Sequence, residues 1–367
     1  MMTELVTISN GADSAARSRA LALHEVHSLP VLVIFPHNQC NCRCVMCDIW
    51  RIREGKQITP EDLEEHLSSI KKLGVRWVVF SGGEPQLNQK WSWLAQMLRG
   101  AGCRVTLLTA GLLLEPQAQV VVESIDDVIV SVDGPAALHN SIRRVRGAFQ
   151  QMAAGVAALR RLRPAMEIRG RCTVQKANHQ ALRSVVLAAK EIGLTSISFL
   201  AGDLTSSAFN RTEPWPSDRV ARVALAAGEV DALEAEVEAL MRDCRADMQS
   251  GFVVEPAEKL RRIVRHFQAQ LGQEQPVAPR CNAPWVSAVV EASGDVRPCF
   301  FHPVMGNIHE RPLAQIINSE DALRFRAGLD VAGNSTCRRC VCSLYIPDQT
   351  PPVDLQGSRD LLLEGEG

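Results

Sequence analysis

Basic and acidic residues nearly cancel in this chain, where 40 Lys and Arg residues stand against 41 Asp and Glu residues for a formal net charge of -1. Proteins that bind the phosphate backbone of nucleic acids need an excess of basic residues. A short basic run such as Arg160-Arg161 is typical of a solvated helix face. The charge balance therefore excludes nucleic acid as the expected partner.

Long apolar runs are also missing from the 367 residues. No stretch approaches the roughly 20 apolar residues that a membrane-spanning helix needs. Residues 1–29 are polar, contain Arg17 and Arg19, and lack the continuous apolar core of a secretory signal. With 46% hydrophobic and 22% charged residues, the composition is typical of an intracellular enzyme, and we expect a cytoplasmic location.

Cysteine, in contrast, is abundant, and most of the 12 cysteines fall into two groups near the two ends of the chain. Disulfides are rare in a reducing compartment, so this many cysteines indicates metal binding or catalysis. The length suits two or three domains at roughly 150 residues each.

The first cysteine group follows the apolar run Val31–Phe35 and consists of Cys40, Cys44 and Cys47 in a C-x3-C-x2-C spacing. Three thiolates in one short loop can hold three irons of a [4Fe-4S] cluster and leave the fourth iron open for chemistry. A structural zinc site is the alternative, but it normally takes four closed ligands. Cys42 and Asp48, the next candidates, fit tetrahedral spacing poorly.

A glycine-rich turn, Ser81-Gly82-Gly83-Glu84-Pro85, follows the apolar segment Val75–Phe80 and precedes a helical pattern. Its two glycines allow a ligand to approach the backbone closely. The Glu84 carboxylate beside them can accept a hydrogen bond from a ligand ammonium group. By itself the turn would be weak evidence, since an incidental acid can follow any glycine-rich turn.

Together the two motifs resemble the signature of the radical S-adenosylmethionine (radical SAM) superfamily. The resemblance implies that S-adenosylmethionine binds the open iron through its amino and carboxylate groups, and that Gly82, Gly83 and Glu84 bind the amino group. Met46 departs from the family, in which an aromatic residue often precedes the third cysteine. This departure concerns only the contact with the adenine ring.

Short apolar strands alternate with helical patterns over the first half of the chain, which indicates βα units around a parallel sheet. One expected helix begins after Thr59, where Pro60 and two acids suit a first turn, and stops at Gly74. The fold class we predict is α/β, a partial (β/α)6 TIM-like barrel, and the resemblance implies the same shape over about residues 30–204. The expected strands are Val31–Phe35, Trp77–Phe80, Arg104–Leu108, Asp127–Val132, Glu167–Val174 and Ser196–Leu200.

Functional groups of parallel barrels lie at the carboxyl ends of the strands. The strand-four segment Ser131-Val132-Asp133-Gly134 is similar to a Ser-x-Asp-Gly motif of the family, so Ser131 and Arg143 are expected to meet the cofactor carboxylate. A solvated place in the basic run 143–146 is the alternative for Arg143. Arg171 lies on strand five, where a buried arginine needs an anion, and it is a further cofactor contact by resemblance. Past strand six, the candidates for substrate binding are Asp203, Asn210 and Arg211, although an Asp after Gly is also an ordinary turn residue.

The second cysteine group is preceded by two or three expected connecting helices and surrounds a hairpin with a turn at residues 293–295. It resembles the auxiliary-cluster module, called twitch or SPASM, of some family members. Four cysteines match the ligands of that module, a fifth, Cys342, could replace the last ligand or donate a proton or hydrogen atom, and four-thiolate zinc is the alternative. The chain lacks the further cysteines of the longer form, so we expect one auxiliary cluster. The matching ligands are Cys281, Cys299, Cys337 and Cys340.

The expected organisation is an N-terminal extension, the barrel, connecting helices, an auxiliary-cluster domain with a β-hairpin, and a tail. Their ranges are 1–29, 30–215, 216–277, 278–345 and 346–367.

The resemblance implies two [4Fe-4S] clusters, S-adenosylmethionine, an electron donor such as flavodoxin or ferredoxin, and an oxidative C–H modification by a 5′-deoxyadenosyl radical. Because 29 N-terminal residues are too few for a leader-binding domain, we expect a small metabolite as substrate. Modification of a ribosomal peptide remains the enzymatic alternative. A non-catalytic, metal-stabilised scaffold is a further alternative, but folding alone would not require both the cysteine loop and Gly82-Gly83-Glu84.

Overall fold

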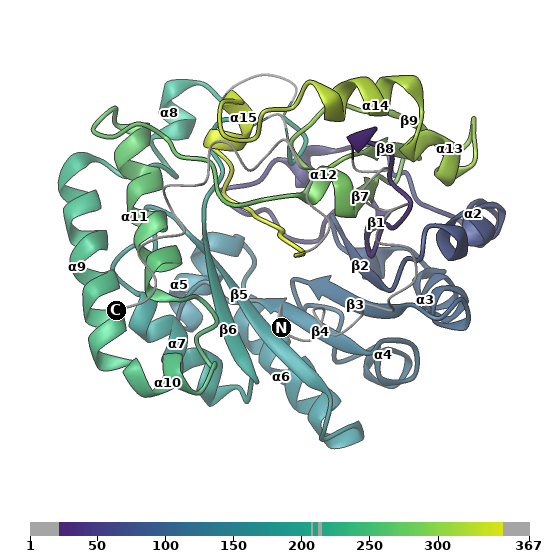
Figure 1. The fold of residues 1–367 in the computed structure, drawn as a ribbon. Coiled ribbons are helices and arrows are strands. Elements are labelled where there is room, and N and C mark those ends of the chain that lie inside the picture. The colour runs from purple at the N-terminus through teal and green to yellow at the C-terminus, as the bar shows by residue number, and fades with distance from the viewer. Residues whose placement is uncertain (1–21, 207, 212–214, 348–367) are drawn as a thin grey trace.

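Nine strands form one sheet in the computed structural model, which describes residues 22–206, 208–211 and 215–347. The sheet order is β6-β5-β4-β3-β2-β1-β7-β8-β9, in which β1 to β6 are parallel neighbours, β7 is parallel to β1, and β8 and β9 pair antiparallel (Figure 1). The strands are β1 (Val31–His37), β2 (Trp77–Gly82), β3 (Arg104–Thr109), β4 (Asp127–Ser131), β5 (Glu167–Val174), β6 (Ser196–Ala201), β7 (Ser287–Val290), β8 (Asp295–Arg297) and β9 (Gly306–Asn307).

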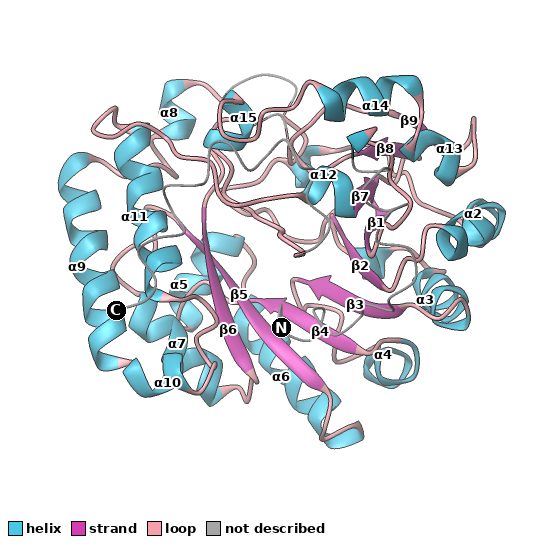
Figure 2. Ribbon diagram, in the orientation of Figure 1, coloured by secondary structure: helices cyan, strands magenta, loops and turns pink. Residues whose placement is uncertain are grey.

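The six expected strands are confirmed, each within two residues at either end. Helices lie on one side of the curved sheet of β1 to β6 and leave its other face turned inward, as Figure 2 shows. This is the partial (β/α)6 barrel that the alternation of strands and helices predicts. The helices of the barrel are α2 (Pro60–Lys72), α3 (Trp91–Gly100), α4 (Ala118–Ser124), α5 (Ala136–Arg143), α6 (Ala148–Leu162) and α7 (Leu182–Glu191), with short 3-10 turns η2 (Ile49–Arg51) and η3 (Pro85–Leu87).

Helix α2 begins as its sequence predicts. The Thr59 hydroxyl accepts a hydrogen bond from the Asp62 N–H at 3.1 Å, and the Asp62 carboxylate accepts one from the Thr59 N–H at 2.8 Å. This reciprocal capping box satisfies two backbone donors that the first helical turn leaves free. The helix ends at Lys72, two residues before Gly74, whose φ is +63°.

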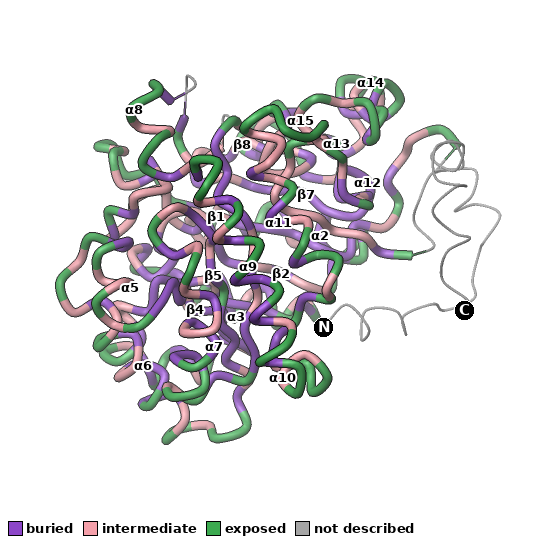
Figure 3. The backbone as a smooth tube through the Cα atoms, turned by 90° about the vertical axis from the view of Figure 1, so that its left-hand side faces the viewer, coloured by how far each residue is buried: buried purple, intermediate pink, exposed green. Residues whose placement is uncertain are grey.

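The hydrophobic core lies between the outer face of the sheet and these helices (Figure 3). Strand residues that point outward, such as Val78, Leu107 and Val130, are fully buried against helix residues such as Leu98 and Val156. Because side chains alternate along a strand, the intervening residues face the interior of the barrel. Any polar site inside the barrel must therefore be built from those alternate positions.

Connecting helices and the C-terminal module complete the fold. Residues 216–277 contain four helices in place of the expected two or three: α8 (Ser217–Val220), α9 (Ala227–Asp243), α10 (Arg245–Gln249) and α11 (Ala257–Gln270). The module adds α12 (Ala283–Val286), α13 (Leu313–Ile317), α14 (Glu320–Ala327) and α15 (Ser335–Arg338). Its hairpin of β7 and β8 turns at Gly294, whose φ of +86° suits glycine. The turn at residues 293–295 is thereby confirmed.

The described ends of the chain are tied to the module. Val26 exchanges two backbone hydrogen bonds with the Asn318 side chain, at 2.8 and 2.9 Å. Ile346 does the same with Asn282, at 3.0 and 2.7 Å. The part of the expected N-terminal extension that the structure describes therefore packs against the body of the protein, while residues 348–367 of the expected tail lie outside the described residues. In the part of the chain that the structure describes, no helix combines the length and apolar character needed to cross a membrane.

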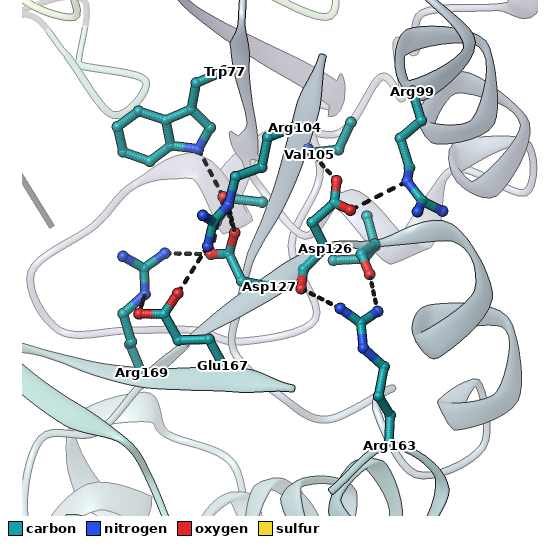
Figure 4. Close-up of polar contacts among 11 residues, drawn as sticks. Trp77, Arg99, Arg104, Val105, Asp126, Asp127, Arg163, Glu167 and Arg169 are labelled. Carbon is teal, nitrogen blue, oxygen red and sulfur yellow. Dashed lines mark hydrogen bonds and ion pairs between the residues drawn. The ribbon is translucent and has the colours of Figure 1, made fainter. Parts of the chain in front are cut away.

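Polar residues close the inner face of the sheet at its amino-terminal end (Figure 4). Asp127 of β4 accepts hydrogen bonds from Arg104 Nε at 2.8 Å and from the Thr106 hydroxyl at 2.9 Å, and it pairs with Arg169 of β5. Trp77 of β2 donates to Thr106 at 2.7 Å. The charged groups of this layer are paired with one another. A ligand site is therefore expected at the opposite, carboxyl ends of the strands.

Candidate active site

The glycine-rich turn after β2 lies directly against the cysteine loop after β1. The Glu84 N–H donates to the Gln39 carbonyl at 2.8 Å, and the Gly83 N–H donates to the His37 carbonyl at 3.3 Å. A Cβ on Gly83 would lie only 2.0 Å from the Gln39 oxygen, so no larger residue fits there. Gly82 has φ +100°, and a Cβ on it would lie 2.6 Å from the Phe35 ring. The two glycines are thus required by the approach of the cysteine loop.

The other side of the cysteine loop is held by α5 and by the segment after β6. Arg43 N–H donates to the Arg143 carbonyl at 3.0 Å, and Val45 N–H donates to the Ile142 carbonyl at 3.1 Å. Asp48 N–H donates to the Phe209 carbonyl at 3.3 Å. The positions of Cys40, Cys44 and Cys47 are therefore fixed by backbone contacts from three separate parts of the barrel.

Cysteine sulfurs in this loop accept hydrogen bonds. Sulfur ligands of iron–sulfur clusters do the same, and the reduction potential of a cluster depends on these bonds. Cys40 Sγ accepts from the N–H of Cys42 at 3.5 Å, and Cys47 Sγ accepts from the N–H of Ile49 at 3.4 Å. Arg143 Nη1 lies 3.6 Å from Cys44 Sγ. A hydrogen bond from Cys42, helped by Arg143, lowers the pKa of the Cys44 thiol to about 7 in spite of its burial. The donor set fits an iron–sulfur cluster.

Two further observations bear on the type of metal centre. Cys103, which lies in the core far from the loop in sequence, donates its thiol to the Val75 carbonyl at 3.3 Å and thus behaves as an ordinary buried thiol. Among the described residues, no three His, Cys, Asp or Glu side chains are arranged as a site for a single metal ion. The fit to a cluster rests on the accepting sulfurs and the backbone donors around them.

Glu84 is completely buried at the end of β2. Both of its carboxylate oxygens accept from the Thr109 hydroxyl at 2.9 Å, one accepts from the Ala110 N–H at 3.0 Å, and one from the Gln86 N–H at 3.3 Å. Burial raises the pKa of Glu84 to about 7, although these donors oppose the shift. The carboxylate is therefore rigidly held and close to its titration point at neutral pH.

Arg143 is buried beside Asp133, so the alternative of a solvated surface position is wrong. Its Nε donates to Asp133 Oδ2 at 2.6 Å, and Asp133 also accepts from the Thr173 N–H at 3.4 Å. Ser131 ends β4 and is half-buried. Ser131 therefore lies at the carboxyl end of β4, and Arg143, at the end of α5, lies against Cys44.

Arg171 differs from the expectation of a buried arginine. Its side chain is exposed, and the buried arginine of β5 is Arg169, which pairs with Asp127. Arg171 is aligned in the sheet with Ser131 on one side and Ser198 on the other. The exposure of Arg171 shows that solvent reaches the inner face of β5 at this position.

The three predicted substrate residues are committed to contacts within the protein. Arg211 Nη1 donates to Asp203 Oδ2 at 2.7 Å, and Nη2 donates to the Asp203 carbonyl at 2.9 Å and to the Met46 carbonyl at 3.4 Å. Asn210 donates to the Asp48 carbonyl at 3.1 Å. These contacts bring Asp203 and Arg211 together and attach the segment after β6 to the cysteine loop.

Asp48 lies at the centre of a set of contacts that sequence reasoning missed. Its buried carboxylate accepts from Trp215 Nε1 at 2.5 Å and from Arg51 Nε at 2.9 Å, and it pairs with Arg219. The partners stand more than 160 positions away in the sequence, except for Arg51. No local pattern could have indicated this hub, which holds the end of the loop next to Cys47.

The second cysteine group is brought together by the module. Burial, together with the neighbouring thiols of Cys281 and Cys337, raises the pKa of Cys299 to about 12. Cys340 has a raised pKa from burial and from the nearby Cys342, Cys299 and Cys281. Cys281 Sγ accepts from the Ala283 N–H at 3.5 Å, in the same way as Cys40 and Cys47 accept from the second residue after them.

Cys342 has different surroundings from the other four. Burial raises the pKa of its thiol, and the charges that act on it next come from Arg171, Asp203 and Lys259, ahead of Cys281. This fifth cysteine therefore faces residues of the barrel and α11, while Cys340 lies among the predicted ligands.

Aromatic rings connect the two cysteine groups. Phe300 and Phe301 directly follow Cys299. The Phe300 ring centroid lies 5.8 Å from that of Phe35 on β1, and the Phe301 centroid lies 6.4 Å from that of Phe209, whose carbonyl binds Asp48. The auxiliary module therefore packs its cysteine-bearing loop against the mouth of the barrel.

A partial parallel barrel with a cluster loop at its mouth and a cysteine-rich module against it defines a class of iron–sulfur enzymes. The family model for the Radical SAM superfamily matches residues 34–173, and that for SPASM, an iron-sulfur cluster-binding domain, matches residues 281–341. The chain belongs to the radical SAM superfamily and carries an auxiliary-cluster domain. Its cofactors are S-adenosylmethionine and two [4Fe-4S] clusters.

Known proteins support this placement. An AdoMet-dependent heme synthase of Methanosarcina barkeri is 25% identical over 302 residues, which are 78% of this chain and 81% of the relative. A PqqA peptide cyclase of Bradyrhizobium diazoefficiens is 29% identical over 93 residues, 24% of each chain. Streptococcus suis SuiB bound to precursor peptide SuiA has a similar fold, with a TM-score of 0.63 and 15% identity over 91% of this chain and 77% of that one.

Proposed function

We propose that this protein cleaves S-adenosylmethionine reductively and uses the resulting radical for an oxidative C–H modification of a small metabolite. The observation that carries the proposal is the pair of backbone hydrogen bonds, at 2.8 and 3.3 Å, that joins Gly83 and Glu84 to the cysteine loop. They attach the segment that carries the buried Glu84 to the residues directly before Cys40. When bound, the cluster and S-adenosylmethionine supply a 5′-deoxyadenosyl radical, and the chemistry belongs to these cofactors.

The residues of the chain would hold and orient the cofactor. Cys40, Cys44 and Cys47 would bind three irons, and Glu84 would accept a hydrogen bond from the ligand ammonium group. Gly82 and Gly83 would allow the ligand to approach the backbone, and Ser131 and Arg143 would meet its carboxylate. Arg143 already lies 3.6 Å from Cys44 Sγ, which supports this assignment.

An oxidative outcome needs an acceptor for the second electron after a substrate hydrogen atom is removed. Cys281, Cys299, Cys337 and Cys340 would fill every ligand position of the auxiliary cluster and leave none for direct substrate binding. A full set of protein ligands therefore favours electron acceptance, and hence dehydrogenation or cyclisation. Electrons would enter from a reductant such as flavodoxin or ferredoxin.

Modification of a ribosomal peptide is the second candidate. The fold similarity to SuiB bound to its precursor peptide and the partial match to a PqqA peptide cyclase favour it. The match over 78% of this chain to a heme synthase, which is named for a small-molecule product, favours the first.

The test is anaerobic reconstitution with iron and sulfide, followed by dithionite reduction in the presence of S-adenosylmethionine. We expect about eight irons per chain, as two [4Fe-4S] clusters require, and formation of 5′-deoxyadenosine. The variant in which Cys40, Cys44 and Cys47 are all replaced by Ala should keep about half of the iron and form no 5′-deoxyadenosine. Bound S-adenosylmethionine that is never cleaved by the fully loaded protein would contradict the proposal.

A further inference from the structure

Arg171 is a cation without a counter-ion on the inner face of the barrel. Its guanidinium group makes no hydrogen bond or ion pair among the described residues. Arg169, the next inward-facing residue towards the amino-terminal end of β5, is paired with Asp127 (Figure 4). Of these two arginines of β5, Arg169 therefore has an acidic partner in the fold, and the guanidinium group of Arg171 can bind a ligand.

Every acid around the mouth of the barrel is already engaged. Asp133 pairs with Arg143 at 2.6 Å, Asp203 pairs with Arg211 at 2.7 Å, and Glu255 pairs with Lys259 at 3.3 Å. Glu255 also accepts a backbone hydrogen bond from Phe199, and Arg171 acts on it only through its charge. Among the described residues, no acid therefore forms an ion pair with Arg171.

The surroundings of Arg171 suit a bound oxyanion. Ser131, its neighbour in register on β4, has a hydroxyl group that can donate to an oxyanion, whereas the hydroxyl of Ser198, its neighbour on β6, already donates to the Gly170 carbonyl at 3.2 Å. A planar guanidinium group binds a carboxylate or phosphate through two parallel hydrogen bonds.

We infer that Arg171 anchors an oxyanion group, a carboxylate or a phosphate, of the substrate. This inference rests on the proposed function, and it narrows the substrate to an anionic molecule that enters the barrel with its anion on β5. Arg171 is then a specificity-determining residue that borders, at Ser131, the residues proposed to hold S-adenosylmethionine.

The test uses the full-length, cluster-reconstituted protein with S-adenosylmethionine bound, and two probes, inorganic phosphate and acetate. The melting temperature is followed against probe concentration at constant ionic strength for the wild type, Arg171→Gln, Arg171→Lys and the control Arg161→Gln. Arg161 is exposed on α6. We expect at least one probe to stabilise the wild type and the control equally, with a half-saturating concentration at least tenfold higher for Arg171→Gln. Arg171→Lys should lie between them, because it keeps the charge and loses the planar fork.

The stronger probe identifies the group, since phosphate points to a phosphorylated substrate and acetate to a carboxylic acid. Without a probe, Arg171→Gln should melt at or above the wild-type temperature, because an unpaired cation is removed. Equal responses of Arg171→Gln and wild type, or no response of the wild type to either probe, would overturn the inference.

Binding of S-adenosylmethionine separates this role from a cofactor contact. We expect its dissociation constant to change less than twofold in Arg171→Gln, and a tenfold weakening would assign Arg171 to the cofactor. The formation of 5′-deoxyadenosine is measured on the same wild-type preparation. Its absence would contradict the proposed function while leaving the probe result to decide the role of Arg171.

Discussion

Arg143 Nη1 lies 3.6 Å from Cys44 Sγ while Arg143 Nε donates to Asp133 at 2.6 Å. One buried guanidinium group thus joins the carboxyl end of β4 to the cysteine loop. The pair places a positive charge at one corner of the expected cluster. It also means that neither partner can be removed without leaving the other charge buried.

The substitution Arg143→Met is expected to lower the free energy of unfolding of the metal-free protein by about 3–5 kcal/mol, because it leaves the fully buried Asp133 without its partner. The double variant Asp133→Asn/Arg143→Met should recover a large part of this loss. Urea unfolding at neutral pH measures both values, with Arg161→Met as the control on an exposed helix position. Equal stability of the single and double variants would show that the ion pair does not carry the effect.

Gly83→Ala is expected to abolish loading of the first cluster. A Cβ at this position would lie 2.0 Å from the Gln39 carbonyl oxygen, so the turn and the cysteine loop would have to separate. Iron per chain should fall by about half, to the four irons of a single cluster. Gly228→Ala on α9 is the control, because a Cβ there meets no atom within 4 Å. Full iron in Gly83→Ala would show that the loop tolerates the separation.

Much of this arrangement is encoded locally. Strands buried on both faces read as short apolar runs, which is why β1 to β6 could be located within two residues. The helix cap at Thr59, the cysteine motif and the glycine motif also depend on residues close in sequence, so they could be predicted as well. The contacts of Asp48 could not be predicted from neighbouring residues. Trp215 and Arg219 follow β6 in the sequence, and they approach Asp48 only because the sheet order places β6 where it does.

The two arginines of β5 illustrate the same limit. Side chains alternate along a strand, so Arg169 and Arg171 share one face of β5, but alternation does not show that Arg169 pairs with Asp127 and that Arg171 is exposed. The difference depends on which arginine lies next to Asp127, and this is set by the register of β3, β4 and β5.

Affinity for S-adenosylmethionine is expected to depend on pH through Glu84, whose pKa burial raises to about 7. The iron-bound amino group of the ligand donates a hydrogen bond, which favours the ionised carboxylate, so the dissociation constant should fall as pH rises towards 7 and then level off. Well below pH 7 the affinity should weaken about tenfold per pH unit. Glu84→Gln should bind more weakly and without this dependence. Calorimetric titration of the reconstituted protein between pH 5.5 and 7.5, a range chosen around that pKa, makes the comparison.

Stability should show the opposite trend with pH. Because the folded-state pKa of Glu84 lies above its value in the unfolded chain, the folded protein binds this proton more tightly. In the metal-free protein, the contribution of Glu84 to the free energy of unfolding therefore falls between about pH 4.5 and pH 7, by at most about 3 kcal/mol. A wild type and a Glu84→Gln variant with parallel pH profiles would contradict the assignment.

The ligand of the auxiliary cluster is expected to be Cys340 and not Cys342. The charges of Cys299 and Cys281 raise the pKa of Cys340, whereas the pKa of Cys342 is raised mainly by burial and is affected next by Arg171 and Asp203 of the barrel, ahead of Cys281. In the background that lacks Cys40, Cys44 and Cys47, Cys340→Ala should therefore lose nearly all remaining iron. Cys342→Ala should keep about four irons per chain, the content of one [4Fe-4S] cluster, with an unchanged visible spectrum. The reverse pattern would make Cys342 the ligand and would move the auxiliary cluster towards Arg171, which would leave less room there for a substrate anion.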